Sequence, residues 1–232
     1  YKRWKFFGNN FSKLIMNFDK IFVQSNHDLS KIENLTSLRV SFIGNLKLTS
    51  LPLQINKQRL ENISRNISNK KVILIASSHP KEEYLILNGI RRIVEDNSNI
   101  LIIIVPRHPN RSNEVLSIAK MFLEKSYIES SEKFDKNTEC LISSSLGEMA
   151  TYYELSDIVI LGGSFIPKGG HNPIEPARQN CSIITGQYIF NWQSIYEEMT
   201  NQEACILCKS PMELKNSVDL LINNIEFEKK LD

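Results

Sequence analysis

Short apolar runs alternate along most of the chain with longer segments whose apolar positions recur at helical spacing. The apolar runs predict strands at residues 72–76, 100–105, 157–161, 182–185 and 204–208. Helical patterns follow at Glu82–Glu95, Ser112–Glu124, a short stretch near Ala177, Asn191–Thr200 and Pro211–Asn223. Because the runs are continuously apolar, their strands should be buried on both faces, as in a parallel sheet covered by helices. Residues 71–209 are therefore predicted to form an α/β, Rossmann-like domain, followed by a helical segment at 210–232.

The first 48 residues predict a smaller unit. A strand at 21–25, a helix at Asn26–Leu35 and a strand at 40–47 make one βαβ crossover. Two strands are too few for an independent sheet, so we interpret this unit as the remnant of a domain that continues upstream of Tyr1. The polar residues 49–70 are predicted to be the linker between the two domains.

Composition narrows the classes of function. The chain has 232 residues, of which 41% are hydrophobic, and a net charge of +2 from 28 basic and 26 acidic side chains. This balance gives no general attraction to nucleic acid, and none is expected as a partner. The longest apolar run, at 100–105, is far shorter than a membrane span. The basic and aromatic cluster at residues 2–7 fits either a membrane-interface segment or a helix packed in the upstream domain.

The cysteines show no disulfide or metal-site spacing. Cys205 and Cys208 form a CxxC pair, but they lie in a predicted strand, where side chains three positions apart point to opposite faces. We therefore interpret all four cysteines as buried thiols and predict no metal site.

The loop after the predicted strand 157–161 combines glycines, prolines and one carboxylate. It reads GGSFIPKGGHNPIEP over residues 162–176, a spacing that matches neither the P-loop nor the dinucleotide fingerprint. Its glycines permit positive φ angles and close approach of the backbone to a ligand. Glu175 lies in the positive field of a helix start at the carboxyl edge of the sheet. A carboxylate placed there could accept both hydroxyls of a ribose.

Helix capping is the alternative for the same residues. Asn172 would be the N-cap, Pro173 the first helical residue and Glu175 the third. Pro176 disturbs this arrangement, because it would lack the N–H of the first intrahelical hydrogen bond. A helix that begins at Pro176 would put Glu175 at the N-cap, a position that glutamate does not favour. Ligand binding and capping both stay open.

Three further strand ends have a similar character. Arg107 follows the most apolar strand in VPRHP, where it could bind a phosphate or form a surface salt bridge. Gly147-Glu148-Met149 begins a predicted helix that could present N–H groups to a ligand or be capped by serine. His79 ends the strand 72–76 and could contact a ligand or complete a turn.

The segments LGEMATYY, DIVILGGSFIPKGGHNPIEPA, TGQYIFNW and VPRHP resemble those of the 3-deoxy-D-manno-octulosonic acid (Kdo) transferases, which are GT-B glycosyltransferases. The resemblance covers nearly the whole chain. It implies CMP-Kdo as the donor, lipid IV-A as the acceptor, inversion at the anomeric carbon, and no cofactor or metal. The residues that it places around CMP are Pro106, Arg107, Gly147, Glu148, Met149, Asn172, Pro173, Ile174 and Glu175. Further donor contacts would come from His79, Lys168 and His171.

The resemblance also implies what this sequence does not carry. The family's general base is a glutamate of the N-terminal domain, which also receives the lipid and holds the membrane anchor. We therefore expect no catalytic residue here, assign no base role to Glu148, and expect a donor half acting at the cytoplasmic face of the bacterial inner membrane. A separate N-terminal half could complete it. The alternatives are a GT-B transferase or epimerase that uses a uridine nucleotide, and a nucleotide-binding remnant without catalysis.

Overall fold

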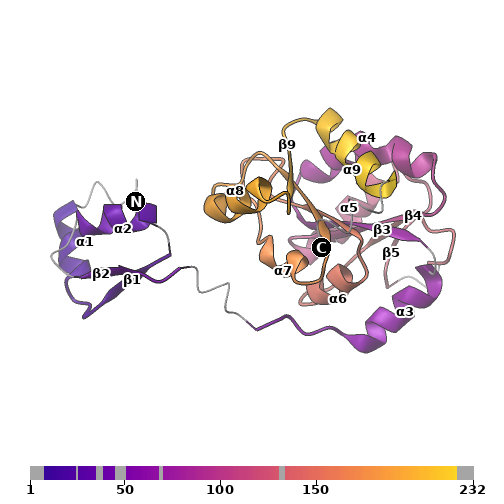
Figure 1. Ribbon diagram of the computed structural model, residues 1–232. Coiled ribbons are helices and arrows are strands. Elements are labelled where there is room, and N and C mark those ends of the chain that lie inside the picture. The colour runs from indigo at the N-terminus through magenta and orange to yellow at the C-terminus, as the bar shows by residue number, and fades with distance from the viewer. Residues whose placement is uncertain are drawn as a thin grey trace. The chain divides into compact units, whose positions relative to one another are not determined.

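The structure is a computed structural model that describes residues 8–24, 26–34, 39–44, 51–67, 70–130 and 134–223. The cluster at residues 2–7 lies outside this part of the chain. Two compact units are present, Tyr1–Leu51 and Pro52–Asp232, and each is described by itself (Figure 1).

The larger unit is built on a seven-stranded sheet in the order β5-β6-β4-β3-β7-β8-β9, and every pairing is parallel. The strands are β3 (Lys71–Ser78), β4 (Ile100–Pro106), β5 (Ser126–Ile128), β6 (Cys140–Ile142), β7 (Ile158–Leu161), β8 (Ser182–Gly186) and β9 (Ile206–Cys208). The parallel α/β sheet predicted from the apolar runs is confirmed. The strands β5 and β6 were not predicted, because runs of three residues give too short a pattern.

Helices cover both faces of this sheet. They are α3 (Lys57–Ile67), α4 (Glu82–Glu95), α5 (Ser112–Ala119), α6 (Met149–Glu154), α7 (Ile174–Ala177), α8 (Gln193–Asn201), α9 (Pro211–Asn223) and the 3₁₀ turn η3 (Pro109–Arg111). Alternate residues of β3 point to opposite faces. Ile73 and Ile75 pack with α4, α5 and α9, whereas Leu74 packs with α3, α6 and α8. Two separate cores therefore hold the sheet rigid from both sides.

The segment 49–70 differs from the predicted linker. The boundary between the units falls after Leu51, and α3 belongs to the larger unit. Ile63 and Ile67, one helical turn apart, are buried in the second core at 1% and 7% exposure. Asn56 caps α3 by accepting a hydrogen bond from the N–H of Arg59 at 3.1 Å. The few apolar residues of this polar stretch thus form one helical stripe, which is why composition alone suggested a linker.

The predicted C-terminal segment is likewise part of the larger unit as far as it is described. The helix α9 lies against α4, where a Cβ on Gly89 would be 3.5 Å from the carbonyl oxygen of Pro211. All four cysteines are free and buried, which confirms their interpretation as buried thiols.

The smaller unit contains α1 (Gly8–Ile15), β1 (Ile21–Val23), α2 (Asn26–Glu33) and β2 (Val40–Phe42). The strands β1 and β2 pair in parallel, so the predicted βαβ crossover is present with shorter strands. The helix α1 was not predicted. Its Ile15 is buried, as are Val23 and Val40. That this unit is a remnant of an acceptor domain stays a prediction.

Candidate functional site

The candidate site lies at the carboxyl ends of the strands, where the direction of the chain through the sheet reverses. From β3 the chain passes to β4 on one side, and later it continues through β7 to β8 and β9 on the other. Loops that leave neighbouring strands toward opposite sides open a crevice between them, and ligands of doubly wound sheets bind there.

The end of β3 and the loop after β7 come unusually close at this point. Ser77 has a left-handed φ of 56°, and the pairing of β3 with β4 shifts register between Ala76 and Ser78. A Cβ on Gly162 would lie only 2.5 Å from the carbonyl oxygen of Ser77. Position 162 therefore requires glycine for the close approach of two backbone segments. The sequence predicted close approach to a ligand, and that stays a prediction.

Two histidines from the facing loops meet at the crevice. His79 follows β3, His171 ends the glycine loop, and their Nε2 atoms are 3.0 Å apart. The two rings are parallel within 1° with centroids 5.2 Å apart, so they lie edge to edge in one plane and share a hydrogen bond. The ring of His108, from the loop after β4, stands at 85° to that of His79 with a centroid distance of 6.5 Å. Three of the four histidines of this chain thus gather at one edge of the sheet.

The surroundings of the imidazole pair favour its neutral form. Burial, the neighbouring His79 and the charge of Arg107 lower the pKa of His171 to about 4, although a hydrogen bond to the backbone of Ser77 opposes them. Burial and the charge of Lys168 likewise lower the pKa of His79. If His171 donates to the Ser77 carbonyl through Nδ1, its Nε2 is the acceptor and His79 is the donor of the pair.

A buried carboxylate, which was not predicted from the sequence, organises both loops. Glu82, at the start of α4, is 0% exposed. Its carboxylate accepts four backbone hydrogen bonds, from the N–H groups of His79 at 3.1 Å, Gly163 at 2.8 Å, Ser164 at 3.1 Å and Phe165 at 3.0 Å. Burial raises the pKa of Glu82, and the hydrogen bonds from the backbone oppose that rise.

The rest of the glycine loop is braced by its neighbours. Gly170 donates its N–H to the carbonyl of Gly163 at 2.9 Å, and the Tyr196 hydroxyl donates to the carbonyl of His171 at 2.8 Å. The Asn191 side chain donates to the carbonyl of Lys168 at 2.9 Å. The Lys168 side chain itself is exposed. The loop is therefore a fixed support that presents one cation to solvent.

Arg107 and Pro106 lie where the sequence predicted, at the end of β4. The side chain of Arg107 is exposed and forms no ion pair with the described part of the chain. The surface salt bridge considered as its alternative role is therefore not seen among the described residues, and phosphate binding by Arg107 stays a prediction. Arg107 donates its backbone N–H to the carbonyl of Ser78 at 2.9 Å, and its charge acts on both His79 and His171, so Arg107 lies near the imidazole pair.

At the end of the loop, the helix begins one residue later than the capping prediction placed it. The helix α7 starts at Ile174, whose N–H donates to Oδ1 of Asn172 at 3.1 Å, and Pro173 holds the N-cap position. Pro176 is then the third helical residue. The N–H at that position has no acceptor within a helix, so a proline there removes no helical hydrogen bond. Glu175 accepts a hydrogen bond from Nδ2 of Asn172 at 3.0 Å and is partly exposed. Asn172 therefore does shape the helix start, and Glu175 is tied to it.

Glu148 is held by Asn56, which caps α3, and by Thr151 of α6. Its carboxylate accepts from Nδ2 of Asn56 at 3.2 Å and from the Thr151 hydroxyl at 3.3 Å. The helix α6 begins at Met149 with Glu148 at its N-cap and no side-chain cap, so the predicted serine cap is not formed. Gly147 has a left-handed φ of 80° with open space around it.

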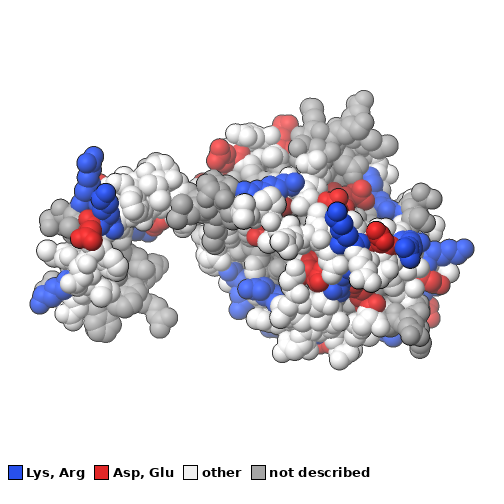
Figure 2. All heavy atoms as spheres, turned by 90° about the horizontal axis from the view of Figure 1, so that it is seen from below, with Lys and Arg blue, Asp and Glu red and all other residues white. Residues whose placement is uncertain are grey.

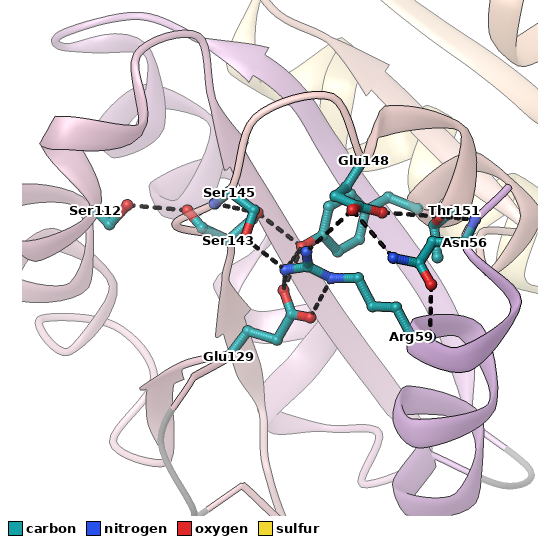
Figure 3. A network of polar contacts seen from close by, with 9 residues as sticks. Asn56, Arg59, Ser112, Glu129, Ser143, Ser145, Glu148 and Thr151 are labelled. Carbon is teal, nitrogen blue, oxygen red and sulfur yellow. Dashed lines mark hydrogen bonds and ion pairs between the residues drawn. The ribbon is translucent and has the colours of Figure 1, made fainter. Parts of the chain in front are cut away.

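Beside Glu148 lies a partly buried polar network, which Figure 3 shows and which the sequence did not reveal. Arg59 binds both oxygens of Glu129 at 2.5 Å and donates to Ser145 and Tyr152 at 2.9 Å. The Tyr152 hydroxyl forms hydrogen bonds with Glu129 and with Ser143 and donates its single proton to the Glu129 carboxylate; burial raises the pKa of Tyr152, so this donor stays protonated. A surface cavity of about 310 Å³ opens next to Arg59 and Glu129. This network joins α3, the loop after β5 and α6.

The predicted residues therefore fall into two groups at one sheet edge. The first holds Arg107, Lys168, His79 and His171 around the crevice between β3 and β7. The second holds Gly147–Met149 and Asn172–Glu175, because α6 packs on α7 and the charge of Glu175 acts on Tyr153.

Basic and acidic side chains are interspersed over the face of the larger unit in Figure 2. Among the described residues, no three potential metal ligands gather and no helix has the length and apolar character to cross a membrane.

Comparison with known proteins identifies the relatives of this chain. It is 31% identical over 224 residues to a 3-deoxy-D-manno-octulosonic acid transferase of Rickettsia bellii, a match that covers 96% of this chain and 53% of the relative. The chain is a homologue of the Kdo transferases. It spans about half the length of the curated relatives that it matches. No family model matches the sequence.

Solved structures place the fold of this Kdo transferase homologue. The C-terminal CMP-Kdo binding domain of WaaA from Acinetobacter baumannii superposes with a TM-score of 0.69 and 27% identity, over 76% of this chain and 95% of that domain. The C-terminal domain of a group 1 glycosyltransferase from Francisella tularensis superposes with a TM-score of 0.51 at 14% identity, over 79% of this chain and 91% of that domain, which bears on the fold alone. The larger unit therefore has the fold of the C-terminal half of a GT-B glycosyltransferase, as predicted.

Proposed function

We propose that this chain is the donor-binding half of a Kdo transferase, which binds CMP-Kdo at the carboxyl edge of its parallel sheet. The observation that carries the proposal is homology to Kdo transferases over 96% of the chain. The structural likeness to a domain described as binding CMP-Kdo supports it. The complete enzyme would transfer Kdo to lipid IV-A in lipopolysaccharide synthesis at the cytoplasmic face of the bacterial inner membrane.

The chemistry assigned to this half is binding and charge stabilisation. When an acceptor hydroxyl attacks the anomeric carbon of Kdo, the bond to CMP breaks and negative charge develops on the departing phosphate. Arg107 and Lys168 are the exposed cations at the crevice that would stabilise this charge, which positioned positive groups can do without a metal. The base that removes the hydroxyl proton would come from the N-terminal half of the enzyme, which could be a separate chain.

Nucleotide recognition is assigned to the second group of residues. Glu175 and Asn172 would bind the ribose and Gly147-Glu148-Met149 the cytosine side, with Pro106 and Arg107 at the phosphate end. The pairing of Asn172 with Glu175 is compatible with this role, because it fixes one carboxylate oxygen and leaves the group partly exposed.

Isothermal titration of the chain with CMP and with UDP tests the proposal. CMP should bind and UDP should bind at least about tenfold more weakly, since the proposed ligand is a cytidine nucleotide. Glu175→Ala should abolish measurable CMP binding, and Glu175→Gln, which keeps an acceptor for Asn172 but no charge, should weaken it about tenfold or more with an unchanged melting temperature.

The outcomes separate the alternatives. Tighter binding of UDP would favour a uridine-dependent transferase or epimerase. Unchanged CMP affinity in Glu175→Ala, together with a lower melting temperature, would show that Glu175 only supports its own helix. CMP binding without transfer, even when an intact acceptor half is supplied, would indicate a remnant that has lost catalysis.

A further inference from the structure

The loop after β7 has the form of an anion-binding nest that is already filled. Gly163, Ser164 and Phe165 direct three consecutive N–H groups toward one point, with Gly163 in the left-handed region at a φ of 68°. Consecutive N–H groups in such a turn bind phosphates in many nucleotide sites. Here the carboxylate of Glu82 occupies that point, fully buried among the donors.

The same carboxylate also binds the facing loop. Its Oε2 accepts from the N–H of His79 as well as from that of Gly163, whereas Oε1 accepts from Ser164 and Phe165. The two walls of the crevice are thus tied to one group. His79 lies on one wall and His171 on the other. The length of the Glu82 side chain, which is hydrogen-bonded to both walls, therefore sets the distance between the two rings.

The packing of His171 against the glycine loop leaves little room for a different distance between the two imidazole rings. A Cβ on Gly163 would be 3.2 Å from the His171 ring and 3.5 Å from the His79 ring, so both imidazoles rest directly on the loop that Glu82 holds. A displacement of the loop would therefore move the imidazole pair and the crevice with it.

We propose that Glu82 is a positioning residue of the donor site, which fills the N–H nest of the glycine loop and fixes His79 against His171, so that the phosphate of the ligand binds outside the nest. The part of this proposal that concerns the ligand rests on the proposed function. The part that concerns the histidines does not.

Glu82→Gln is the informative variant, and Glu83→Gln is its matched control. Each oxygen of Glu82 accepts from two N–H groups, so whichever way the amide turns, its NH₂ faces two donors and two hydrogen bonds are lost. Glu83 is also 0% exposed and adjacent in sequence, but it binds Arg111 at 2.7 Å and Ser78 at 2.8 Å, away from the glycine loop. Both variants remove one buried negative charge.

The measurements use the whole chain and report on the histidines and the ligand separately. Imidazole ¹⁵N NMR of the wild type should show the shared hydrogen bond and a titration of His171 far below that of a free histidine. In Glu82→Gln the His171 titration should move toward the value of free histidine and CMP affinity should fall about tenfold or more. In Glu83→Gln, whose lost charge also acts on His79, the His171 titration should move much less than in Glu82→Gln, and CMP affinity should stay at the value of the wild type.

Two results would overturn the proposal: a folded Glu82→Gln variant with unchanged histidine spectra, or equal changes in both variants. If Glu82→Gln does not fold, Glu82→Asp takes its place, because it keeps the charge but shortens the side chain that connects the two loops. Glu82→Asp should shift the His171 titration, and an unshifted titration refutes the proposal. Failure of the wild type to bind CMP would refute the proposed function alone, because the histidine spectra still test the positioning role.

Discussion

Replacing Arg59 by methionine removes the cation at the centre of the network in Figure 3 while keeping a long, helix-compatible side chain. The side chains of Arg59 and Glu129 are only 18% and 10% exposed, and their two hydrogen bonds are both 2.5 Å long. The variant leaves Glu129 with the Tyr152 hydroxyl as its remaining partner in this network.

The expected cost follows from this burial. Removing one partner of a buried ion pair costs about 3–5 kcal/mol, because the other charge stays unpaired in a poorly solvated place. Since both groups retain some contact with water, we expect the free energy of unfolding to fall by about 2–4 kcal/mol. The same helix offers a control in Arg65, whose pair with Glu61 is 3.7 Å long and 74% and 67% exposed. Arg65→Met should change stability by less than about 1 kcal/mol.

Urea denaturation of both variants, followed by circular dichroism, measures the difference. A double-mutant cycle with Glu129→Gln should give a coupling energy of about 2 kcal/mol, since the two residues share one contact. Equal losses in Arg59→Met and Arg65→Met would show that α3 is not held to the sheet by this pair. The assignment of α3 to the larger unit would then rest on its apolar contacts alone.

Two further predictions concern the crevice. The pKa of His171 is about 4 in the folded chain, against an ordinary value of 6.5. As the pH falls, the unfolded chain therefore takes up this proton before the folded chain does. The stability contributed by neutral His171 is present above pH 6.5 and is lost as the pH falls toward 4. The full pKa shift corresponds to about 3 kcal/mol of stability, or about 2 kcal/mol after allowing for partial exposure. In thermal denaturation across this pH range, the stability of His171→Asn should depend less on pH than that of the wild type. Gly163→Ala should lower the free energy of unfolding by about 1–3 kcal/mol. A residue with a Cβ is strained at a φ of 68°, and the added Cβ would also press on the ring of His171. An unchanged melting temperature would contradict this packing.

Four of the five strands predicted for the larger unit have apolar surroundings on both sides; the fifth, β9 at the edge of the sheet, was predicted from the longer apolar run 204–208. β3, β4, β7 and β8 lie in the middle of the sheet, and continuous apolar runs identify such strands without knowledge of their partners. β5 and β6 have three residues each, and their strand character comes from pairing with neighbours. The helix α3 was missed for a related reason, although Asn56 and the spacing of Ile63 and Ile67 carried a signal for it.

The site was predictable in place but not in its internal contacts. Because parallel strands end at one edge, the loops with Arg107, Glu148 and Glu175 could be assigned to that edge from the sequence. Their partners could not: Glu82 binds residues more than eighty positions away, and Arg59 reaches Glu129 seventy positions along the chain. Long-range polar contacts of this kind leave no periodic pattern in a single sequence.

The distribution of charge at the crevice explains why its most glycine-rich loop need not be its phosphate site. Inside the loop the anion is Glu82, which has no contact with solvent. Outside it, Arg107 and Lys168 are exposed; both lower the pKa of His79, and Arg107 also lowers that of His171. An incoming phosphate would be repelled by Glu82 on the inner side and attracted by two cations on the outer side. The glycines thus serve the close approach of two backbone segments. Under the proposed function, the affinity for an anion would come from the exposed side chains of Arg107 and Lys168.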